Sequence, residues 1–189
     1  MKKLHYCDIY SITDNTYAKQ FIRSLINMLK QLNIIDKSVK TSESSAVNVC
    51  DNTMERYIEA AIDRCRCIVI VVDSEGRDPD EVRKTIIDEH VKSFTTDLSR
   101  IRIVVAHPCL EAWLCRLMGL QSCESGTCRD VIHAIERVIG GKYDKKLLPI
   151  LTMRWLSKRI NPEKPSLNNL PEQLRELLNT IINCSSQSS

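Results

Sequence analysis

The stretch CIVIVVDSEG, residues 67–76, decides how the rest of the chain is interpreted. It holds six consecutive apolar residues, most of them β-branched, and then becomes polar at Asp73 and Glu75. An unbroken apolar run is typical of a strand that is buried on both faces, as in a parallel sheet covered by helices. Ligands of such sheets bind beyond the carboxyl ends of the strands. The stretch therefore predicts an α/β fold with an acidic site at one edge of its sheet.

A second stretch, IRIVVAHPCLE at residues 101–111, repeats this pattern. Ile101–Ala106 again has the composition of a buried strand, and Glu111 follows it. Because the carboxyl ends of parallel strands meet at one edge of a sheet, we expect Asp73, Glu75 and Glu111 to lie close together. Mg²⁺ is usually held by one or two carboxylates, with water and substrate phosphates completing its shell.

These three acids are therefore predicted to bind Mg²⁺ or Mn²⁺, a cation that polarises a phosphoryl oxygen and supplies a water nucleophile. The simpler alternative is that each acid only stabilises the start of the helix that follows it. That alternative applies best to Glu111 and Glu75, and least to Asp73, which directly follows the buried run.

Strands and helices alternate through the first part of the chain. Strands are predicted over residues 4–10, 46–50, 67–72 and 101–106. Helices are predicted over residues 18–32, 54–65, 79–91, 110–120, 129–139, 145–158 and 171–182. This order favours a four-stranded, mainly parallel sheet flanked by helices, with a helical C-terminal extension.

At 189 residues the chain has the size of one domain with a substantial core. The predicted strands stop before Pro108. We therefore divide the chain into an α/β domain over residues 1–120, a helical extension packed on it over residues 121–184, and a disordered tail over residues 185–189.

Composition narrows the environment and the function. The net charge of +3 permits a phosphate-bearing partner without requiring one. No stretch approaches the roughly 20 apolar residues of a membrane span, and the N-terminal residues lack the apolar core of a signal peptide. A cytoplasmic protein without a membrane partner is expected. The chain contains neither a Walker A sequence nor G-x-G-x-x-G, which disfavours nucleotide-driven motors and Rossmann oxidoreductases.

Nine cysteines are many for such a protein, and their odd number and scattered spacing do not indicate a secreted disulfide framework. Cys7, Cys50 and Cys67 fall in apolar runs, where a thiol behaves as a small buried hydrophobe. A further group follows the last predicted strand: Cys109, Cys115, Cys123 and Cys128. The spacing of this group allows zinc binding, a local disulfide between Cys123 and Cys128, or free thiols.

Three short motifs resemble one known family. They are YSITD at residues 10–14, VVDSEG at residues 71–76 and PCLEAWL at residues 108–114. Their order is similar to that of the TOPRIM fold, which topoisomerases, bacterial primases, OLD-type nucleases and recombination-repair proteins share. The likeness is greatest to small stand-alone TOPRIM-like proteins of the RloB and OLD-related kind, and it spans roughly residues 4–120. It implies a Mg²⁺-dependent, phosphodiester-cleaving nuclease of defence or repair that acts on DNA or RNA, with a partner protein or a second copy possible.

The resemblance has one departure. The glutamate that the family carries after its first strand falls on Tyr10, which cannot replace a carboxylate. Asp14, which matches the family's own aspartate, is the first candidate to compensate, and Asp8 is the second. The departure also allows a degenerate, non-catalytic TOPRIM domain that serves as a binding or assembly module. The catalytic set that the resemblance implies is Asp14, Asp73, Glu75 and Glu111.

A few other residues invite a functional interpretation that a structural one outweighs. His107 precedes a proline, where a hydrogen bond within the turn is favoured over a contact with phosphate. Trp113 and Trp155 stand at helical spacing among leucines, which favours core packing over base stacking. A basic run is expected to be a solvated face, although it could neutralise phosphates: Arg154, Lys158, Arg159 and Lys164.

Overall fold

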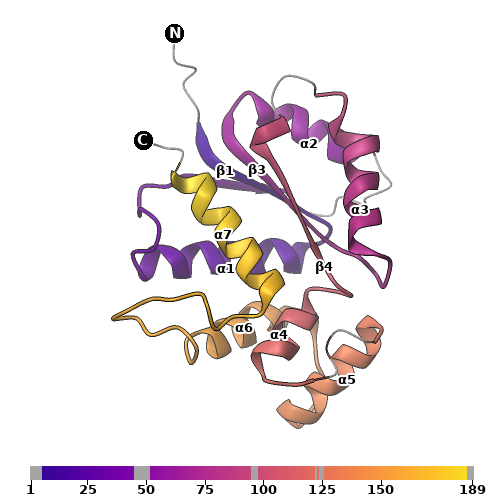
Figure 1. Cartoon of the computed structure of the whole chain (residues 1–189), viewed down its shortest axis with the longest axis vertical. Coiled ribbons are helices and arrows are strands. Elements are labelled where there is room, and N and C mark those ends of the chain that lie inside the picture. The colour runs from indigo at the N-terminus through magenta and orange to yellow at the C-terminus, as the bar shows by residue number, and fades with distance from the viewer. Residues whose placement is uncertain (1–5, 45–51, 95–97, 122, 124–125, 187–189) are drawn as a thin grey trace.

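The computed structural model describes residues 6–44, 52–94, 98–121, 123 and 126–186. Four strands form one sheet in the order β2-β1-β3-β4, and every neighbouring pair is parallel (Figure 1). The strands are β1 (Cys7–Thr13), β2 (Thr41–Ser44), β3 (Cys65–Asp73) and β4 (Ile101–Ala106). The predicted α/β class with a four-stranded parallel sheet flanked by helices is confirmed.

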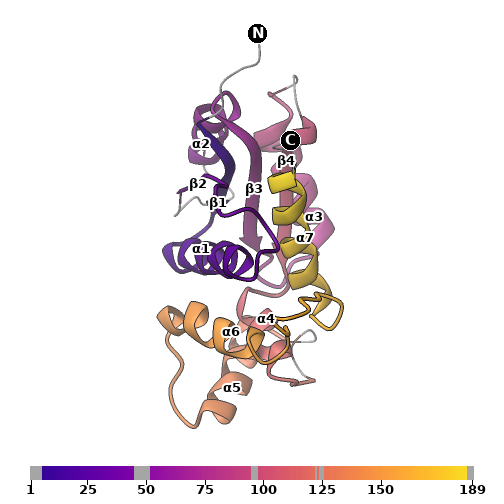
Figure 2. The same cartoon turned by 90° about the vertical axis from the view of Figure 1, so that its left-hand side faces the viewer.

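Helices cover both faces of the sheet and its carboxyl edge (Figures 1 and 2). One face packs on α2 (Thr53–Ile62), α3 (Pro79–Ile86) and the π-helical turn η1 (Ile87–Val91). The other face packs on α1 (Thr16–Gln31) and α7 (Glu172–Ser186). Figure 2 shows the remaining helices below the end where β3 finishes: α4 (Glu111–Leu117), α5 (Cys128–Ile139) and α6 (Leu148–Leu156). Two short 3₁₀ turns complete the described elements: η2 (Leu98–Arg100) and η3 (Lys145–Leu147).

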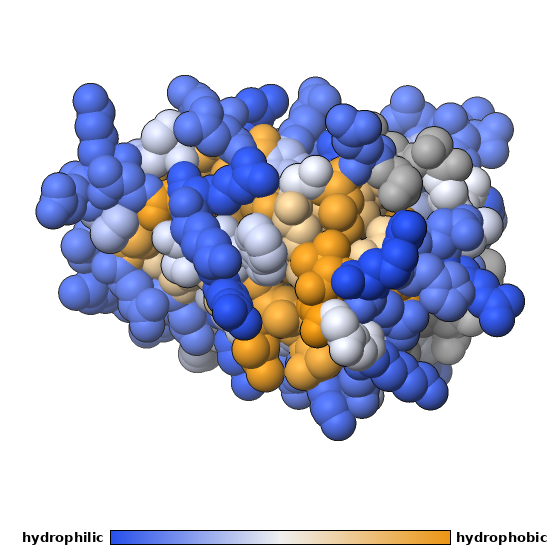
Figure 3. Space-filling model, turned by 90° about the horizontal axis from the view of Figure 1, so that it is seen from below, coloured by the Kyte–Doolittle hydropathy of each residue, from blue (hydrophilic) through white to orange (hydrophobic). Residues whose placement is uncertain are grey.

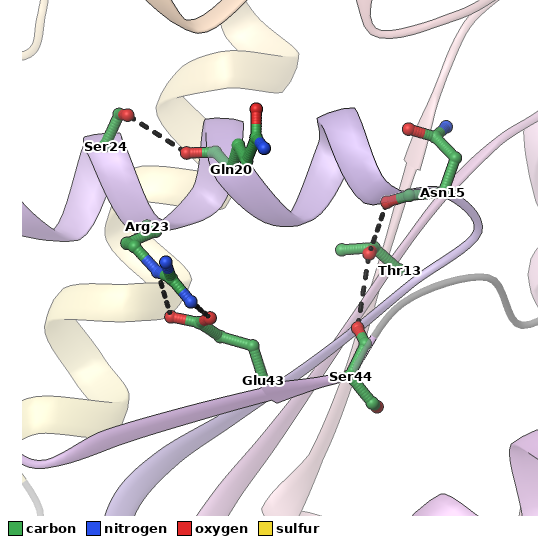
Figure 4. Close-up of polar contacts among 7 residues, drawn as sticks. All are labelled: Thr13, Asn15, Gln20, Arg23, Ser24, Glu43 and Ser44. Atoms are coloured by element: carbon green, nitrogen blue, oxygen red, sulfur yellow. Dashed lines mark hydrogen bonds and ion pairs between the residues drawn. The ribbon is translucent and has the colours of Figure 1, made fainter.

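The second strand differs from the prediction. The predicted strand at residues 46–50 lies outside the described residues, and β2 is formed by Thr41–Ser44, which the sequence analysis treated as a connection. Polar contacts hold this short strand in place (Figure 4). The Thr13 hydroxyl donates to the Ser44 carbonyl at 3.3 Å, and the Arg23 Nε atom of α1 donates to Glu43 at 3.1 Å. Hydrophobic patterning could not reveal a strand that is fixed by polar groups.

The first strand is also displaced from its predicted range. β1 continues to Thr13, so Tyr10 lies within the strand, paired with Ile68, rather than at its end. Tyr10 is half-buried and packs beside the α2 and α3 core. The alignment of Tyr10 with a site residue is therefore wrong in spatial terms, because its side chain lies on the sheet face and not at the carboxyl edge.

The helices beyond residue 120 do not form a separate layer with its own core. Leu148, Leu174 and Ile181 belong to the same buried cluster as Phe21 of α1 and Val69 of β3. The last helix reaches Ser186 and buries Ser185, so the predicted disordered tail begins too early. The chain folds around one sheet with a core on each of its faces.

The outer side of the C-terminal helices exposes apolar side chains. Val138 of α5 is 46% exposed and Ile150 of α6 is 65% exposed. Figure 3 shows apolar side chains gathered on this lower face among charged ones. Exposed apolar patches often mark contact surfaces. Among the described helices, none has both the length and the apolar composition needed to cross a membrane.

Three disulfides link elements of the core. Cys7 of β1 pairs with Cys65 of β3, and Cys67 of β3 pairs with Cys184 of α7. The third joins Cys115 of α4 to Cys123. The expectation that Cys7 and Cys67 are buried free thiols is therefore wrong, because parallel strand pairing and the docking of α7 bring each one beside a partner.

We predict that Cys184→Ser lowers the free energy of unfolding by about 2–4 kcal/mol, the usual range for a disulfide that closes a long loop. Cys67 and Cys184 are 117 residues apart in the sequence, so their bond restricts much of the unfolded chain. Urea denaturation without reductant measures the effect. Cys128→Ser, which removes a cysteine outside the three disulfides, is the control. Equal urea midpoints for Cys184→Ser and the wild type would contradict the prediction.

Candidate acidic site at the carboxyl edge of the sheet

Four carboxylates gather where β1, β3 and β4 end. Asp14 follows the last residue of β1, Asp73 is the last residue of β3, and Glu75 stands two residues further on. Glu111 is the first residue of α4, shortly after β4. Because β3 lies between β1 and β4 and all three run in parallel, their carboxyl ends deliver these acids to one edge.

A pocket of about 510 Å³ opens beside this edge. Asp73, Glu75 and Glu111 all contribute to its lining. The opposite wall comes from the segment that leads into α5 and from the start of η3: Gly126, Thr127, Cys128, Arg129, Ile132 and Lys145. The structure thus brings the three predicted metal ligands to one pocket.

Backbone hydrogen bonds fix Asp73 and Asp14 relative to each other. The Asp73 N–H donates to Asp14 Oδ2 at 3.1 Å, and Asp73 Oδ1 accepts the Leu110 N–H at 2.8 Å. Helix α1 is capped by Asn15, whose Oδ1 accepts the Ala18 N–H at 2.8 Å. Asp14 therefore does not serve as the side-chain cap of α1, and its carboxylate faces the β3 end instead.

Glu75 is held in an unusual backbone conformation. Its φ is +52°, in the left-handed region that non-glycine residues rarely adopt, and Gly76 follows with φ +81°. Two hydrogen bonds impose this turn: the Ser74 N–H donates to the Ala106 carbonyl at 2.8 Å, and the Glu75 N–H donates to the Pro108 carbonyl at 3.0 Å. Backbone strain of this kind concentrates at functional sites, because the surrounding structure must stabilise it.

The crowding of these acids changes their protonation. Burial, then the charges of Asp14 and Glu111, raise the pKa of Asp73 from 3.8 to about 8. Burial is also the main reason that the pKa of Asp14 is raised, against hydrogen bonding to the Asp73 amide and the charge of Lys145. Negative charge has thus accumulated in a place where water screens it poorly.

Lys145 is the cation of this site, and the sequence analysis did not single it out. Burial alone would lower the pKa of Lys145, but the charges of Glu111, Asp73 and Asp14 raise it overall. Lys145 begins η3, for which Asp144 provides the cap by accepting the Lys146 N–H at 3.0 Å. A lysine at the amino end of a helical segment is disfavoured by the helix dipole, and this was the one signal available in the sequence.

Tyr143 also belongs to the site. Its side chain is only 7% exposed, and its hydroxyl has no hydrogen-bond partner of normal geometry within the described part of the chain. Burial, followed by the nearby charge of Glu111, raises the pKa of the Tyr143 phenol. The backbone N–H of Tyr143 donates to Glu136 of α5 at 2.9 Å, which fixes the segment that carries Lys145. Glu111 is therefore enclosed by a phenol and an ammonium group from the same short segment.

Two sequence interpretations concerned the residues around Pro108. His107 Nδ1 lies 2.8 Å from the Ser74 hydroxyl, so the histidine is engaged within the turn, as expected. Trp113 is 1% exposed and packs on Phe21 with ring centroids 5.9 Å apart, which confirms the core interpretation. The Trp113 indole donates to Gln173 Oε1 of α7 at 2.8 Å. Part of the PCLEAWL motif is thus structural, since it anchors α4 on which Glu111 begins.

The cysteines near the site pair differently from the local alternative in the sequence analysis. Cys123 forms its disulfide with Cys115, so the pairing of Cys123 with Cys128 is wrong. That disulfide also removes two of the four sulfurs that zinc binding would have used. Cys109 and Cys128 are thiols, and both line the acidic pocket.

The carboxylates do not surround a single point. Within the described ranges, no three His, Cys, Asp or Glu side chains are arranged so that they could hold one metal ion together. A hard cation at this edge would therefore be held by one or two carboxylates and completed by water and phosphate oxygens, which is the usual arrangement for Mg²⁺. Asp8, the second candidate to compensate for Tyr10, accepts the Lys40 N–H at 2.8 Å near the opposite edge of the sheet and takes no part.

Comparison with known proteins identifies no relative. No family profile matches the chain, and neither a curated protein nor a solved structure matches it significantly.

The raised pKa of Asp73 predicts an unusual dependence of stability on pH. Between pH 3.8 and about 8 the folded protein keeps a proton that the unfolded chain has released, so stability falls as pH rises through this window. The slope is at most about 1.4 kcal/mol per pH unit for one proton. Asp73→Asn, which keeps an oxygen for the Leu110 N–H, should be more stable than the wild type at pH 8, and the difference should shrink toward pH 4. Urea denaturation across this range tests the prediction.

Asp8→Asn, changed near the opposite edge of the sheet, is the control and should retain the slope of the wild type. Parallel curves for the wild type and Asp73→Asn at all pH values would show that Asp73 is not responsible.

Proposed function

We propose that this protein is a Mg²⁺- or Mn²⁺-dependent nucleic-acid-processing enzyme that cleaves phosphodiester bonds, in the manner of a TOPRIM-type nuclease of defence or repair. One observation carries the proposal. Asp73 stands at the end of a buried parallel strand, and the neighbouring acids Asp14 and Glu111, together with burial, raise its pKa to about 8. Perturbed carboxyl groups beside a pocket are typical of functional sites, because a stable fold gains nothing from crowding them.

The donors at this edge suit a hard divalent cation. Asp73 and Glu75 offer carboxylate oxygens to the pocket, and Glu111 adds a third buried carboxylate. A divalent cation would relieve the repulsion that raises the pKa of Asp73, and it would favour the ionised form of that carboxyl group. When bound, such a cation polarises a phosphoryl oxygen and lowers the pKa of a coordinated water.

The chain's own residues then have distinct roles. Asp73 is the central ligand, because its geometry is fixed by the Leu110 N–H. Asp14 faces the same cluster without being occupied as a helix cap, and it is the assigned general base. Lys145 lines the pocket opposite the acids and would bind a phosphate oxygen of the substrate. Arg129 lines the same wall and extends the positive charge along a nucleic-acid backbone.

A second candidate is a non-catalytic binding or assembly module. The arrangement of the acids favours it in one respect, because no three metal-binding side chains in the described ranges share a common centre. In that case Lys145 would neutralise the acids permanently as an internal ion pair. The two functions differ in whether a divalent cation binds at Asp73.

We predict that Asp73→Ala abolishes Mn²⁺- or Mg²⁺-supported cleavage of DNA or RNA while the far-UV circular dichroism spectrum stays unchanged. Glu111→Gln should reduce cleavage and weaken Mn²⁺ binding in calorimetry. Asp8→Asn is the matched control, since it changes an acid near the opposite edge of the sheet. Cleavage by Asp73→Ala at the wild-type rate would favour the binding module, as would the absence of any cation binding by the wild type.

A separate prediction concerns Lys145. Lys145→Met should raise the KM for an oligonucleotide by roughly tenfold, the loss expected for one charged contact with phosphate. Lys146→Met is the matched control, because Lys146 pairs with Asp144 and is not among the pocket-lining residues. Steady-state kinetics at several salt concentrations separate the two. An equal effect of both substitutions would assign Lys145 to general attraction rather than to the site.

A further inference from the structure

Cys109 and Cys128 form a pair of thiols on the wall of the acidic pocket. Of the nine cysteines, six form the three disulfides and Cys50 lies outside the described residues, which leaves these two. They come from separate elements: Cys109 lies in the loop between β4 and α4, and Cys128 is the first residue of α5. Both line the pocket together with Asp73 and Glu111.

The two sulfurs are in contact. The Cys109 thiol donates a hydrogen bond to the sulfur of Cys128. The Cys128 thiol in turn donates to the Pro108 carbonyl at 3.4 Å. Cys109 is 1% exposed, whereas Cys128 is half-buried and borders the open pocket. A small reagent in the pocket would therefore meet Cys128 first, with Cys109 directly behind it.

We propose that Cys109 and Cys128 are a site of reversible oxidation, and that a fourth disulfide between them reduces the activity of the acidic site. The oxidant is a hydroperoxide. Cys128 attacks the peroxide oxygen and becomes a sulfenic acid while the peroxide leaves as an alcohol or water. Cys109 then attacks the Cys128 sulfur and releases water. In total two thiols lose two protons and two electrons, and one hydrogen peroxide becomes two waters.

This pair differs from the three disulfides already present. Cys65, Cys67 and Cys115 are all at most 3% exposed, and their disulfides join elements of the core. Cys109 and Cys128 instead face a pocket of about 510 Å³ that contains carboxylates. Their oxidation state therefore bears on the site rather than on the assembly of the core.

The new bond would act on Asp73 and Glu75 through the loop that carries Cys109. The residue after Cys109 is Leu110, whose N–H donates to Asp73 Oδ1 at 2.8 Å. The residue before it is Pro108, whose carbonyl accepts both the Glu75 N–H at 3.0 Å and the Cys128 thiol. Two sulfurs at hydrogen-bonding distance must move closer to reach about 2.05 Å. This movement pulls on the backbone groups that position both acids.

Oxidation should lower cleavage by roughly tenfold to 100-fold, because a misplacement of about 1 Å has effects of this size. The disulfide itself is independent of the function proposed above, whereas its effect on cleavage rests on that function. The experiment therefore reads the bond and the activity separately.

The test uses the full chain with Cys50→Ser, so that Cys109 and Cys128 are the remaining thiols. Peptide mapping after treatment with hydrogen peroxide should find the two residues cross-linked with the loss of two hydrogen atoms. Cys128→Ser in the same background should give no such cross-link. Unmodified thiols, or Cys128 oxidised alone to a sulfinic acid, would overturn the proposal.

Mn²⁺ binding and cleavage are then measured before and after peroxide in both proteins. A fall in cleavage with Cys128 present and no fall in Cys128→Ser supports regulation of the site. Equal losses in both proteins would overturn it. If the reduced protein neither binds Mn²⁺ nor cleaves nucleic acid, the proposed function fails while the cross-link is still decided by peptide mapping.

Discussion

The parallel pairing of β3 with β1 on one side and β4 on the other is the constraint on which this structure depends. Thr13 pairs with Val71, and Asp73 pairs with Ala106, so the three strands finish within a few residues of one another. Only a strand that is apolar on both faces can occupy the middle of a sheet covered twice by helices. The unbroken run from Cys67 to Val72 therefore determines both the burial of β3 and the position of the first polar residue after it.

That position imposes an electrostatic cost, and the surrounding fold offsets part of it. Asp73 is surrounded by apolar neighbours and by Asp14 and Glu111, which disfavour its charge. The Leu110 amide and the Lys145 ammonium group act in the opposite direction. Both come from segments outside the sheet, so the helices after β4 do more than cover a hydrophobic surface. They supply the donors and the positive charge without which four acids could not gather at one edge.

The sequence predicted the parts of this structure that follow from apolar periodicity. β3, β4 and most helices appear in it directly, because buried faces leave a repeating pattern. β2 does not, since Thr41–Ser44 is held by its backbone and by the ion pair of Glu43 with Arg23. The gathering of Asp73, Glu75 and Glu111 at one pocket was expected from strand topology. Tyr143 and Lys145 were not found, because their approach to Glu111 depends on how the segment after α5 folds back, which no local pattern encodes.

The contact between Gln173 and the β4 loop links the site to the order in which the chain is made. Gln173 Oε1 of α7 accepts both the His107 N–H at 3.2 Å and the Trp113 indole N–H at 2.8 Å. A ribosome that has just released β4 has therefore exposed the residues of the acidic edge, but it has not yet delivered the group that fixes the loop between them. Domains generally fold from the N-terminus during synthesis, and incomplete intermediates expose apolar surface. For this protein the nascent chain must keep α1, the sheet and α4 unfinished until α7 emerges, which makes translation of the last helix the step that completes the site.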